Sequence, residues 1–198
     1  GSATGLSLTP EWTQEGEQAF SYFGTSVSVA GDVNGDGYGD VIIGASGIDG
    51  AAGSRAGKAY VYLGSVDGLR VAGGWTLEGE QSGSGFSSVS GAGDVNGDGY
   101  GDVIIGADRF DGAAGLDAGK AYVYLGSATG LNTLPGWTQE GEQADSKFGD
   151  SVSSAGDVNG DGYGDVVIGA NTFTGTAGYY SGKAYVYFGS ATGLNTLA

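Results

Sequence analysis

The chain lacks cysteine and histidine altogether, and its 198 residues include only two prolines. Without cysteine, the protein forms no disulfide, no thiolate metal site and no cysteine nucleophile. Without histidine, it lacks the commonest general base and the usual zinc ligand. No apolar run approaches the roughly 20 residues that a membrane-spanning helix needs, so no membrane insertion is expected. These absences argue against most hydrolytic enzymes and against integral membrane proteins.

Basic residues are also scarce, because 7 Lys and Arg stand against 23 Asp and Glu, giving a formal net charge of −16. Nucleic acid is therefore excluded as an expected partner, since binding it needs a positive surface. Nine of the acidic residues lie in three copies of one decapeptide, GDVNGDGYGD, which begin at Gly31, Gly93 and Gly156. Charge concentrated in this way indicates a bound cation.

The decapeptide marks an internal repeat. Its first aspartates are Asp32, Asp94 and Asp157, so the period is 62 and then 63 residues. The segments GKAYVY and EGEQ keep the same period, and so does the connector GSATGL or GSVDGL. The pattern predicts one repeat array over residues 1–198, with repeats at about 1–63, 64–125 and 126–188. Residues 189–198 repeat the N-terminal connector.

Each period reads as four short strands separated by turn residues. In the first period, we expect them at 24–30, 40–45, 58–63 and 75–80. The second and third strands are apolar on both faces, as in AYVYL, so each sheet must be covered on both sides. Four-stranded sheets repeated in series and covered by their neighbours describe a β-propeller. The expected fold is therefore all-β, with three antiparallel blades per chain; a solenoid is the alternative, although its repeats are usually shorter.

The decapeptide has the composition of a calcium loop. Side-chain oxygens stand at positions 1, 3, 5 and 9, position 7 can supply a carbonyl, and glycines allow the chain to curl around one ion. A tight Asp-Gly hairpin turn is the simpler alternative, but it does not require the outer aspartates. An EF-hand is disfavoured, because Ile43 replaces the glutamate at position 12 and a strand follows. The first predicted site consists of Asp32, Asn34, Asp36, Tyr38 and Asp40.

The period resembles the FG-GAP repeat of integrin α-subunit propellers. The FG element stands at Phe23-Gly24 and Phe148-Gly149, with Phe86-Ser87 departing from it. The GAP element reads Gly44-Ala45-Ser46, Gly106-Ala107-Asp108 and Gly169-Ala170-Asn171, so its proline is missing in each copy. The resemblance implies three Ca²⁺ ions per chain and an extracellular, adhesion-type binding scaffold. It implies as the second site Asp94, Asn96, Asp98, Tyr100 and Asp102, and as the third Asp157, Asn159, Asp161, Tyr163 and Asp165.

Two other sets of residues are candidates for chemistry or recognition. The spacing of the paired glutamates of EGEQ alone suggests an acid/base pair. Three equivalent copies indicate a structural role instead. Lys58, Lys120 and Lys183 are expected to pair with nearby carboxylates. Between the second and third strands the repeats diverge, and variable loops on a fixed frame are where recognition residues tend to lie. The candidate rim, which tolerated loop variation would also explain, consists of Arg109, Phe110, Phe173, Tyr179 and Tyr180.

The expected function is a non-catalytic, calcium-binding scaffold for a protein or other ligand. A calcium-dependent lectin and a fragment of a secreted multidomain enzyme are the alternatives. Propellers typically close with 4–8 blades. Trp12–Glu17 has the sequence of a fourth strand that precedes any first strand, so we expect it to complete the last blade of another copy. A homodimer of six blades is expected, with a homotrimer of nine as the alternative.

Overall fold

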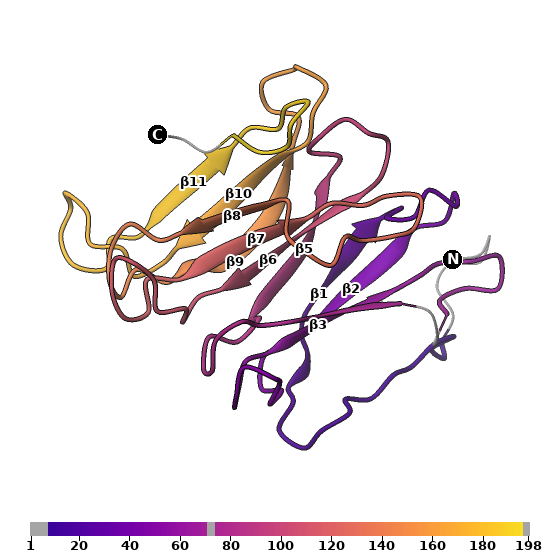
Figure 1. Cartoon of the computed structure of the whole chain (residues 1–198), viewed down its shortest axis with the longest axis horizontal. Helices are drawn as coiled ribbons and strands as arrows, with labels where there is room; N and C mark the ends of the chain where they lie inside the picture. Colours follow the sequence, from indigo (N-terminus) through magenta and orange to yellow (C-terminus); the bar gives the residue numbers. More distant parts are fainter. Residues whose placement is uncertain (1–7, 71–73, 196–198) are drawn as a thin grey trace.

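The computed structural model describes residues 8–70 and 74–195 and contains eleven strands and no helix within them. The strands form three antiparallel sheets in chain order, two of four strands and one of three (Figure 1). Blade 1 consists of β1 (Phe23–Gly31), β2 (Asp40–Ala45), β3 (Lys58–Tyr62) and β4 (Trp75–Glu78). Blade 2 consists of β5 (Ser88–Gly93), β6 (Asp102–Ala107), β7 (Lys120–Tyr124) and β8 (Trp137–Glu140). Blade 3 consists of β9 (Phe148–Gly156), β10 (Asp165–Ala170) and β11 (Lys183–Tyr187).

The strands agree closely with those predicted from the sequence, because Val, Ile and Tyr are concentrated in the second and third strands of each sheet. In blade 1, β2 and β3 pair in a continuous register from Val41–Tyr62 to Ala45–Lys58. In blades 1 and 2 the second and third strands are buried on both faces, as their uniform apolarity requires, whereas β11 of blade 3 is mostly exposed. Each first strand has a register shift beside its second strand, at the residue directly before the acidic loop begins. These bulges bend the edge where the loop leaves the sheet.

Neighbouring blades share their cores. One apolar cluster joins blades 1 and 2 and includes Ile42, Val61, Phe86 and Ile105. A second cluster joins blades 2 and 3, with Ile104, Phe148 and Ile168 fully buried. The first strands of successive blades lie beside one another, so the sheets follow each other face to face as propeller blades do (Figure 1).

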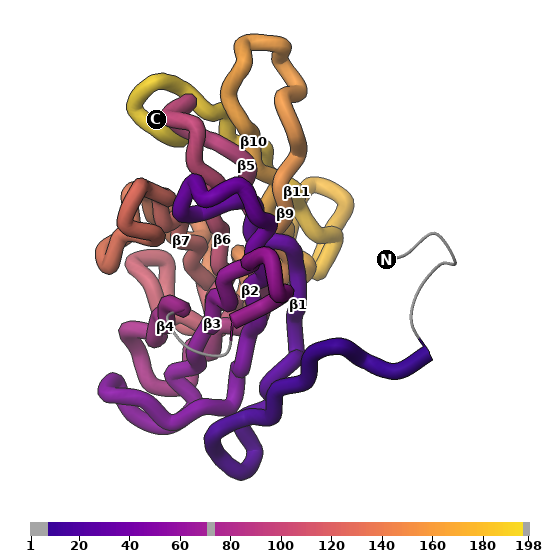
Figure 2. Tube along the Cα trace, turned by 90° about the vertical axis from the view of Figure 1, so that its right-hand side faces the viewer, coloured from indigo at the N-terminus to yellow at the C-terminus, as the bar shows by residue number. Residues whose placement is uncertain are grey.

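The N-terminal segment does not form the predicted strand within a single chain. Residues 9–22 contain no strand, although Trp12–Glu17 runs along blade 1, at the end of the molecule away from blade 3 (Figures 1 and 2). A strand needs a hydrogen-bonding partner, and none of the described strands pairs with this segment. Within the described ranges, blade 3 correspondingly has no fourth strand next to β11. Of the two connector copies, residues 1–7 and 196–198 lie outside the described residues.

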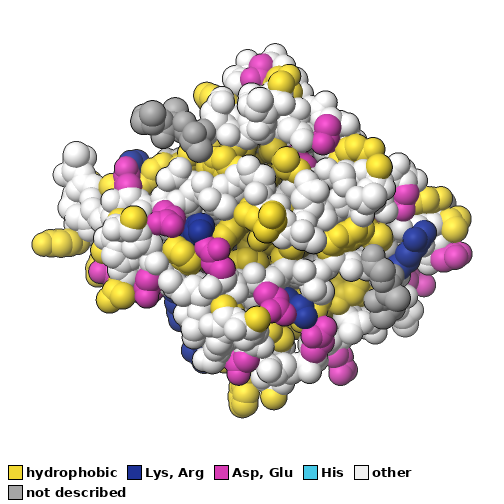
Figure 3. Space-filling model, in the orientation of Figure 1, with side chains coloured by type: hydrophobic (Ala, Val, Ile, Leu, Met, Phe, Trp, Pro, Cys, Tyr) yellow, Lys and Arg dark blue, Asp and Glu magenta, His cyan; other side chains and the backbone are white. Residues whose placement is uncertain are grey.

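The sheets span 23–78, 88–140 and 148–187, so each outer strand falls in the repeat that follows its blade. In residues 8–70 and 74–195, no helix has the length and apolarity to cross a membrane. On the face shown in Figure 3, acidic side chains are spread over the surface, and some of the few basic ones touch them.

Candidate functional site

The three decapeptides form three acidic loops, residues 31–40, 93–102 and 156–165, each joining the first strand of a blade to its second. The glycines in them take up the left-handed backbone conformation that the sequence predicted. Gly35 and Gly37 have φ of 71° and 86°, and the other two loops repeat these values within a few degrees. Side chains other than glycine rarely adopt this conformation, so the glycines are what allows each loop to curl.

The curl brings the first three polar side chains of each loop together. In the first loop, the amide nitrogen of Asp36 donates to Asp32 Oδ1 and to Asn34 Oδ1, both at 3.1 Å. The Asn34 amide donates to Asp36 Oδ2 at 3.1 Å. The same contacts recur in the second and third loops at 2.8–3.1 Å. Oxygen atoms from positions 1 and 3 therefore face one point in every copy.

The aspartate at position 9 has a different environment, because it is buried. Asp102 accepts hydrogen bonds from Val95 N at 2.7 Å and from Gly126 N at 2.8 Å, one on each carboxylate oxygen. Asp40 and Asp165 repeat this pattern. Burial raises the pKa of Asp102 to about 7; the two backbone hydrogen bonds oppose the shift, and the charges of Asp98 and Asp94 add to it. Burial is therefore the main effect that opposes ionisation of this group, and repulsion within the loop adds to it.

To bind one metal ion, the oxygen-bearing side chains of a loop, at positions 1, 3, 5 and 9, must converge on one point. Over residues 8–70 and 74–195, no three Asp, Glu, His or Cys side chains come together closely enough to form a metal-binding group. The position-9 carboxylates face backbone N–H groups, which accounts for their separation from the rest. The donor set still suits Ca²⁺, because every side-chain ligand offers oxygen and the first three already converge. The calcium ligands named from the sequence thus remain a prediction.

The paired glutamates form ion pairs with lysines, which confirms the prediction that the lysines pair with carboxylates. Lys120 Nζ contacts Glu80, which follows the last strand of blade 1, and lies 4.0 Å from Glu140 of its own blade. Lys58 and Lys183 make the equivalent contacts with Glu17 and Glu142. Lys120 and Lys183 thus each tie their blade to the segment after the preceding blade, and Lys58 ties blade 1 to the N-terminal segment. The paired glutamates are thus used in holding the fold.

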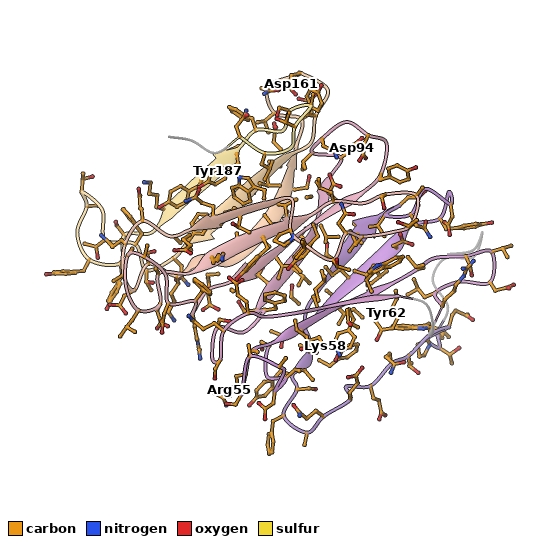
Figure 4. The ribbon with its side chains drawn as sticks, viewed as in Figure 1. Arg55, Lys58, Tyr62, Asp94, Asp161 and Tyr187 are labelled. Atoms are coloured by element: carbon orange, nitrogen blue, oxygen red, sulfur yellow. The ribbon has the colours of Figure 1, made fainter. Side chains whose placement is uncertain are left out.

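The rim loops lie at the opposite ends of the strands from the acidic loops. Figure 4 shows Arg55 on one side of the molecule and Asp94 and Asp161 on the other. Arg109 is exposed on this rim, as are Tyr179 and Tyr180, which border a cavity of about 310 Å³. Phe110, in contrast, belongs to the buried core, with Lys120 Nζ 4.6 Å from its ring centre. Phe173 is partly buried beneath Lys183 in the same way.

A second hollow on this rim was not predicted from the sequence. It has a volume of about 300 Å³ and is lined mainly by residues of blades 1 and 2, with Asp150 contributed by β9 of blade 3. Charged residues of both signs line it, namely Arg55, Arg109, Asp108 and Asp150. Burial and then the charge of Asp108 raise the pKa of Asp150. The hollow presents both donors and acceptors in one place.

The sequence does carry a signal for this hollow. The residue after each Gly-Ala pair varies together with the residue 21 positions before it, at or just before the start of the first strand. Their side chains are in contact across the two strands, as Thr25–Ser46 at 3.5 Å, Ser87–Asp108 at 2.7 Å and Asp150–Asn171 at 2.7 Å. Paired variation at fixed repeat positions therefore marks a polar lining that differs from blade to blade.

Comparison with known proteins identifies the repeats. The FG-GAP repeat model matches residues 23–62, 86–124 and 148–187. Human integrin alpha-6 is 36% identical over 82% of the chain, and Xenopus laevis integrin alpha-5 is 36% identical over 84%. Drosophila melanogaster integrin alpha-PS2 is 34% identical over 87%. The chain spans only 14%, 16% and 12% of the length of these three relatives.

Proposed function

The chain belongs to the FG-GAP repeat family, and we propose that it is a calcium-stabilised, non-catalytic propeller that binds other molecules through its variable rim. The family and the integrin relatives support a ligand-binding propeller scaffold. Calcium, the rim ligand and the extracellular location are the parts of the proposal that go beyond this likeness.

The observation that carries the calcium proposal is the threefold recurrence of one oxygen arrangement. In each acidic loop, side-chain oxygens of positions 1 and 3 lie within 3.1 Å of the same amide nitrogen. A turn alone does not need this convergence, whereas Ca²⁺ takes six to eight oxygen ligands in flexible geometry. The ion would be held by the residues at positions 1, 3, 5 and 9 and by the carbonyl at position 7. Its two positive charges would offset most of the negative charge of the three carboxylates in each loop.

Bound calcium would stabilise the junctions between blades. The acidic loops contact the following blade through backbone hydrogen bonds, such as Gly101 N to Asp32 O at 2.8 Å. A ligand that binds only the folded state adds RT ln(1 + [L]/Kd), which is about 2.7 kcal/mol per site at a hundredfold excess. Extracellular calcium modules work at 10⁻⁴–10⁻³ M, which fits the proposed location outside the cell.

The proposed ligand surface is the rim that carries Arg55, Arg109 and the two exposed tyrosines, Tyr179 and Tyr180. Exposed tyrosine and arginine side chains are enriched in binding surfaces. Because a tyrosine ring also stacks on sugars, a lectin is the second candidate function, supported by the 88% exposure of Tyr179. A glycan array separates the two, since a lectin gives defined sugar binding that Tyr179→Ala removes.

The calcium proposal is tested by titrating Ca²⁺ calorimetrically into chelator-treated protein. We expect three ions per chain and a melting temperature that falls in EGTA. Asp98→Ala should reduce the stoichiometry to two, because it removes one carboxylate ligand from the middle loop. Asp67→Ala, an exposed aspartate in a connector turn, is the matched control and should leave three. No heat of binding, with an unchanged melt in EGTA, would refute the proposal.

A further inference from the structure

The two junctions between blades are built from the same contacts. In both, backbone N–H groups of one blade donate to carbonyl oxygens of the acidic loop of the blade before it. The pairs are Gly101–Asp32 at 2.8 Å and Ser127–Val33 at 3.2 Å, then Gly164–Asp94 at 2.7 Å and Ser190–Val95 at 3.1 Å. Each blade thus has one face that donates to its predecessor and one that accepts from its successor, which we call the head face and the tail face.

Side chains repeat this pattern. The ring of Tyr100 on the head face of blade 2 packs over Gly35, so that a Cβ there would come within 2.6 Å of it. Tyr163 packs over Gly97 in the same way and at the same distance. At the inner strands, Ser26 Oγ accepts from Val89 N at 3.1 Å, and Ser88 Oγ accepts from the corresponding Val152 N, also at 3.1 Å. The junction is therefore a repeating interface.

The head face of blade 1 and the tail face of blade 3 are open copies of that interface. Val27 is 64% exposed, whereas its equivalents Val89 and Val152 are 3% and 6% exposed. At the other end, Val158 is 56% exposed, whereas Val33 and Val95 are fully buried. Tyr38 is exposed, and a Cβ on Gly160 would meet nothing within 4 Å. The exposed Tyr38 on the head face thus corresponds to the empty space over Gly160 on the tail face, as Tyr100 corresponds to Gly35 within the chain.

The N-terminal segment already lies where the outer strand of a preceding blade would lie. Trp12 packs edge-on against Tyr62 at 4.9 Å between ring centres, as Trp137 packs against Tyr187 at 4.9 Å. The side chain of Gln18 accepts from Asp49 N at 2.9 Å, as those of Gln81 and Gln143 do from the equivalent amides in the next two blades. The segment is thus held in position but has no strand partner.

From these matching faces we infer that the head face of blade 1 binds the tail face of blade 3 in a second copy. The N-terminal segment of one copy then adds to β11 of the other as its fourth strand. The pairing of β7 with β8 fixes the register as Val186–Trp12, Tyr185–Thr13, Ala184–Gln14 and Lys183–Glu15. Two copies close a head-to-tail ring of six blades, within the usual range of 4–8, whereas three copies exceed it.

The first test is the solution mass of the 198-residue chain and of three variants. We expect the unaltered chain to have twice its 19.5 kDa. Val27→Arg and Val158→Arg should give 19.5 kDa with unchanged circular dichroism, because both side chains are exposed in a single chain. Leu116→Arg changes an equally exposed apolar residue on the rim and should leave the dimer intact. A monomeric unaltered chain overturns the inference, and a trimer overturns the six-bladed ring.

The second test locates the contact, using the absence of natural cysteines. Paired residues of antiparallel strands have Cα atoms about 4.5–5.5 Å apart, within reach of a disulfide. Gln14→Cys combined with Ala184→Cys should therefore form a cross-linked dimer on oxidation. Thr13→Cys combined with Ala184→Cys should not, because these side chains would point to opposite faces. A cross-link formed by Ala184→Cys alone would mean that two β11 edges pair with each other, which overturns the head-to-tail arrangement.

Discussion

At the scale of single residues, the acidic loops contain two kinds of aspartate. Those at position 5 are exposed and those at position 1 are partly or fully exposed, whereas those at position 9 are buried and accept two backbone hydrogen bonds each. The buried group fastens the loop to the connector that follows the third strand of the same blade. A role in folding and a proposed role in binding thus meet in one decapeptide.

This division predicts unequal effects of the same substitution in one loop. In EGTA, we expect Asp102→Asn to lower the free energy of unfolding by about 2 kcal/mol, because an amide offers one acceptor and leaves a buried N–H unsatisfied. Asp98→Asn should cost less than about 0.5 kcal/mol, since that side chain is exposed. Urea denaturation in the presence of chelator measures both. Equal losses would show that burial does not separate the two aspartates.

The environments of single residues were the features that the sequence predicted least well. The loop glycines, the oxygen-bearing positions and the lysine partners follow from types and spacing that repeat three times. Phe110 was expected on the exposed rim, but Lys120 covers its ring and the core encloses it. Variability alone does not distinguish a loop residue that faces solvent from one that packs inward. The hollow was missed because its lining, which includes Arg55, Asp108 and Asp150, comes from all three blades.

At the scale of elements, strands could be predicted well, because a sheet covered on both faces must be apolar throughout. The boundaries of β2, β3 and β4 lie within two residues of those expected. The N-terminal segment, which we expect to become a strand only on a second copy, forms no strand within a single chain. Its sequence is that of an outer strand, but a strand also needs a neighbour, and a single chain does not bring β11 to it.

Lysines at the start of each third strand connect successive elements. Lys120 contacts Glu80 and lies over the rings of Phe110 and Tyr122, at 4.6 and 5.0 Å from their centres. Although burial acts to raise it, hydrogen bonds from Lys120 and Tyr122 lower the pKa of Glu80 below its ordinary value. Because the Lys120 side chain is only 13% exposed, solvent screens this pair less than it screens a pair in which both side chains are exposed.

Lys120→Met should accordingly lower the free energy of unfolding by about 1–2 kcal/mol, through loss of the charged hydrogen bond and of the cation–π contacts. Arg109→Met removes a cation whose side chain is exposed and lies 3.9 Å from Asp108, and it should change stability by less than about 0.5 kcal/mol. Thermal or urea unfolding of the two variants decides the matter. A loss for Lys120→Met as small as that for Arg109→Met would contradict this role of the lysine.

At the scale of the whole molecule, the three blades use one interface twice and leave its two halves open, one at each end. These open faces predict that a substitution with no neighbour in a single chain still affects dimerisation. Gly160→Ala places a Cβ where nothing in the chain lies within 4 Å, but where Tyr38 of a second copy would pack. We therefore expect it to weaken dimerisation at least tenfold in calcium, measured by sedimentation.

Gly162→Ala is the matched control for this substitution. Its backbone has a similar left-handed conformation, with φ of 91° against 76°, and a Cβ there also meets nothing within 4 Å. Both changes carry the same backbone strain of about 1 kcal/mol. Because the equivalent Gly37 and Gly99 have no contact in any junction, Gly162→Ala should leave the dimerisation constant unchanged. Equal weakening by the two substitutions would place the effect in the loop and not at the interface.

Native mass spectrometry in calcium-containing buffer measures chains and ions together, and so addresses the central claim most directly. The predicted particle contains two chains, each of 19.5 kDa, and three Ca²⁺ ions for each chain. Chelation should remove the ions and shift the population toward single chains, because the acidic loops form part of each junction. A single chain without bound calcium, in calcium-saturated buffer, would contradict the claim.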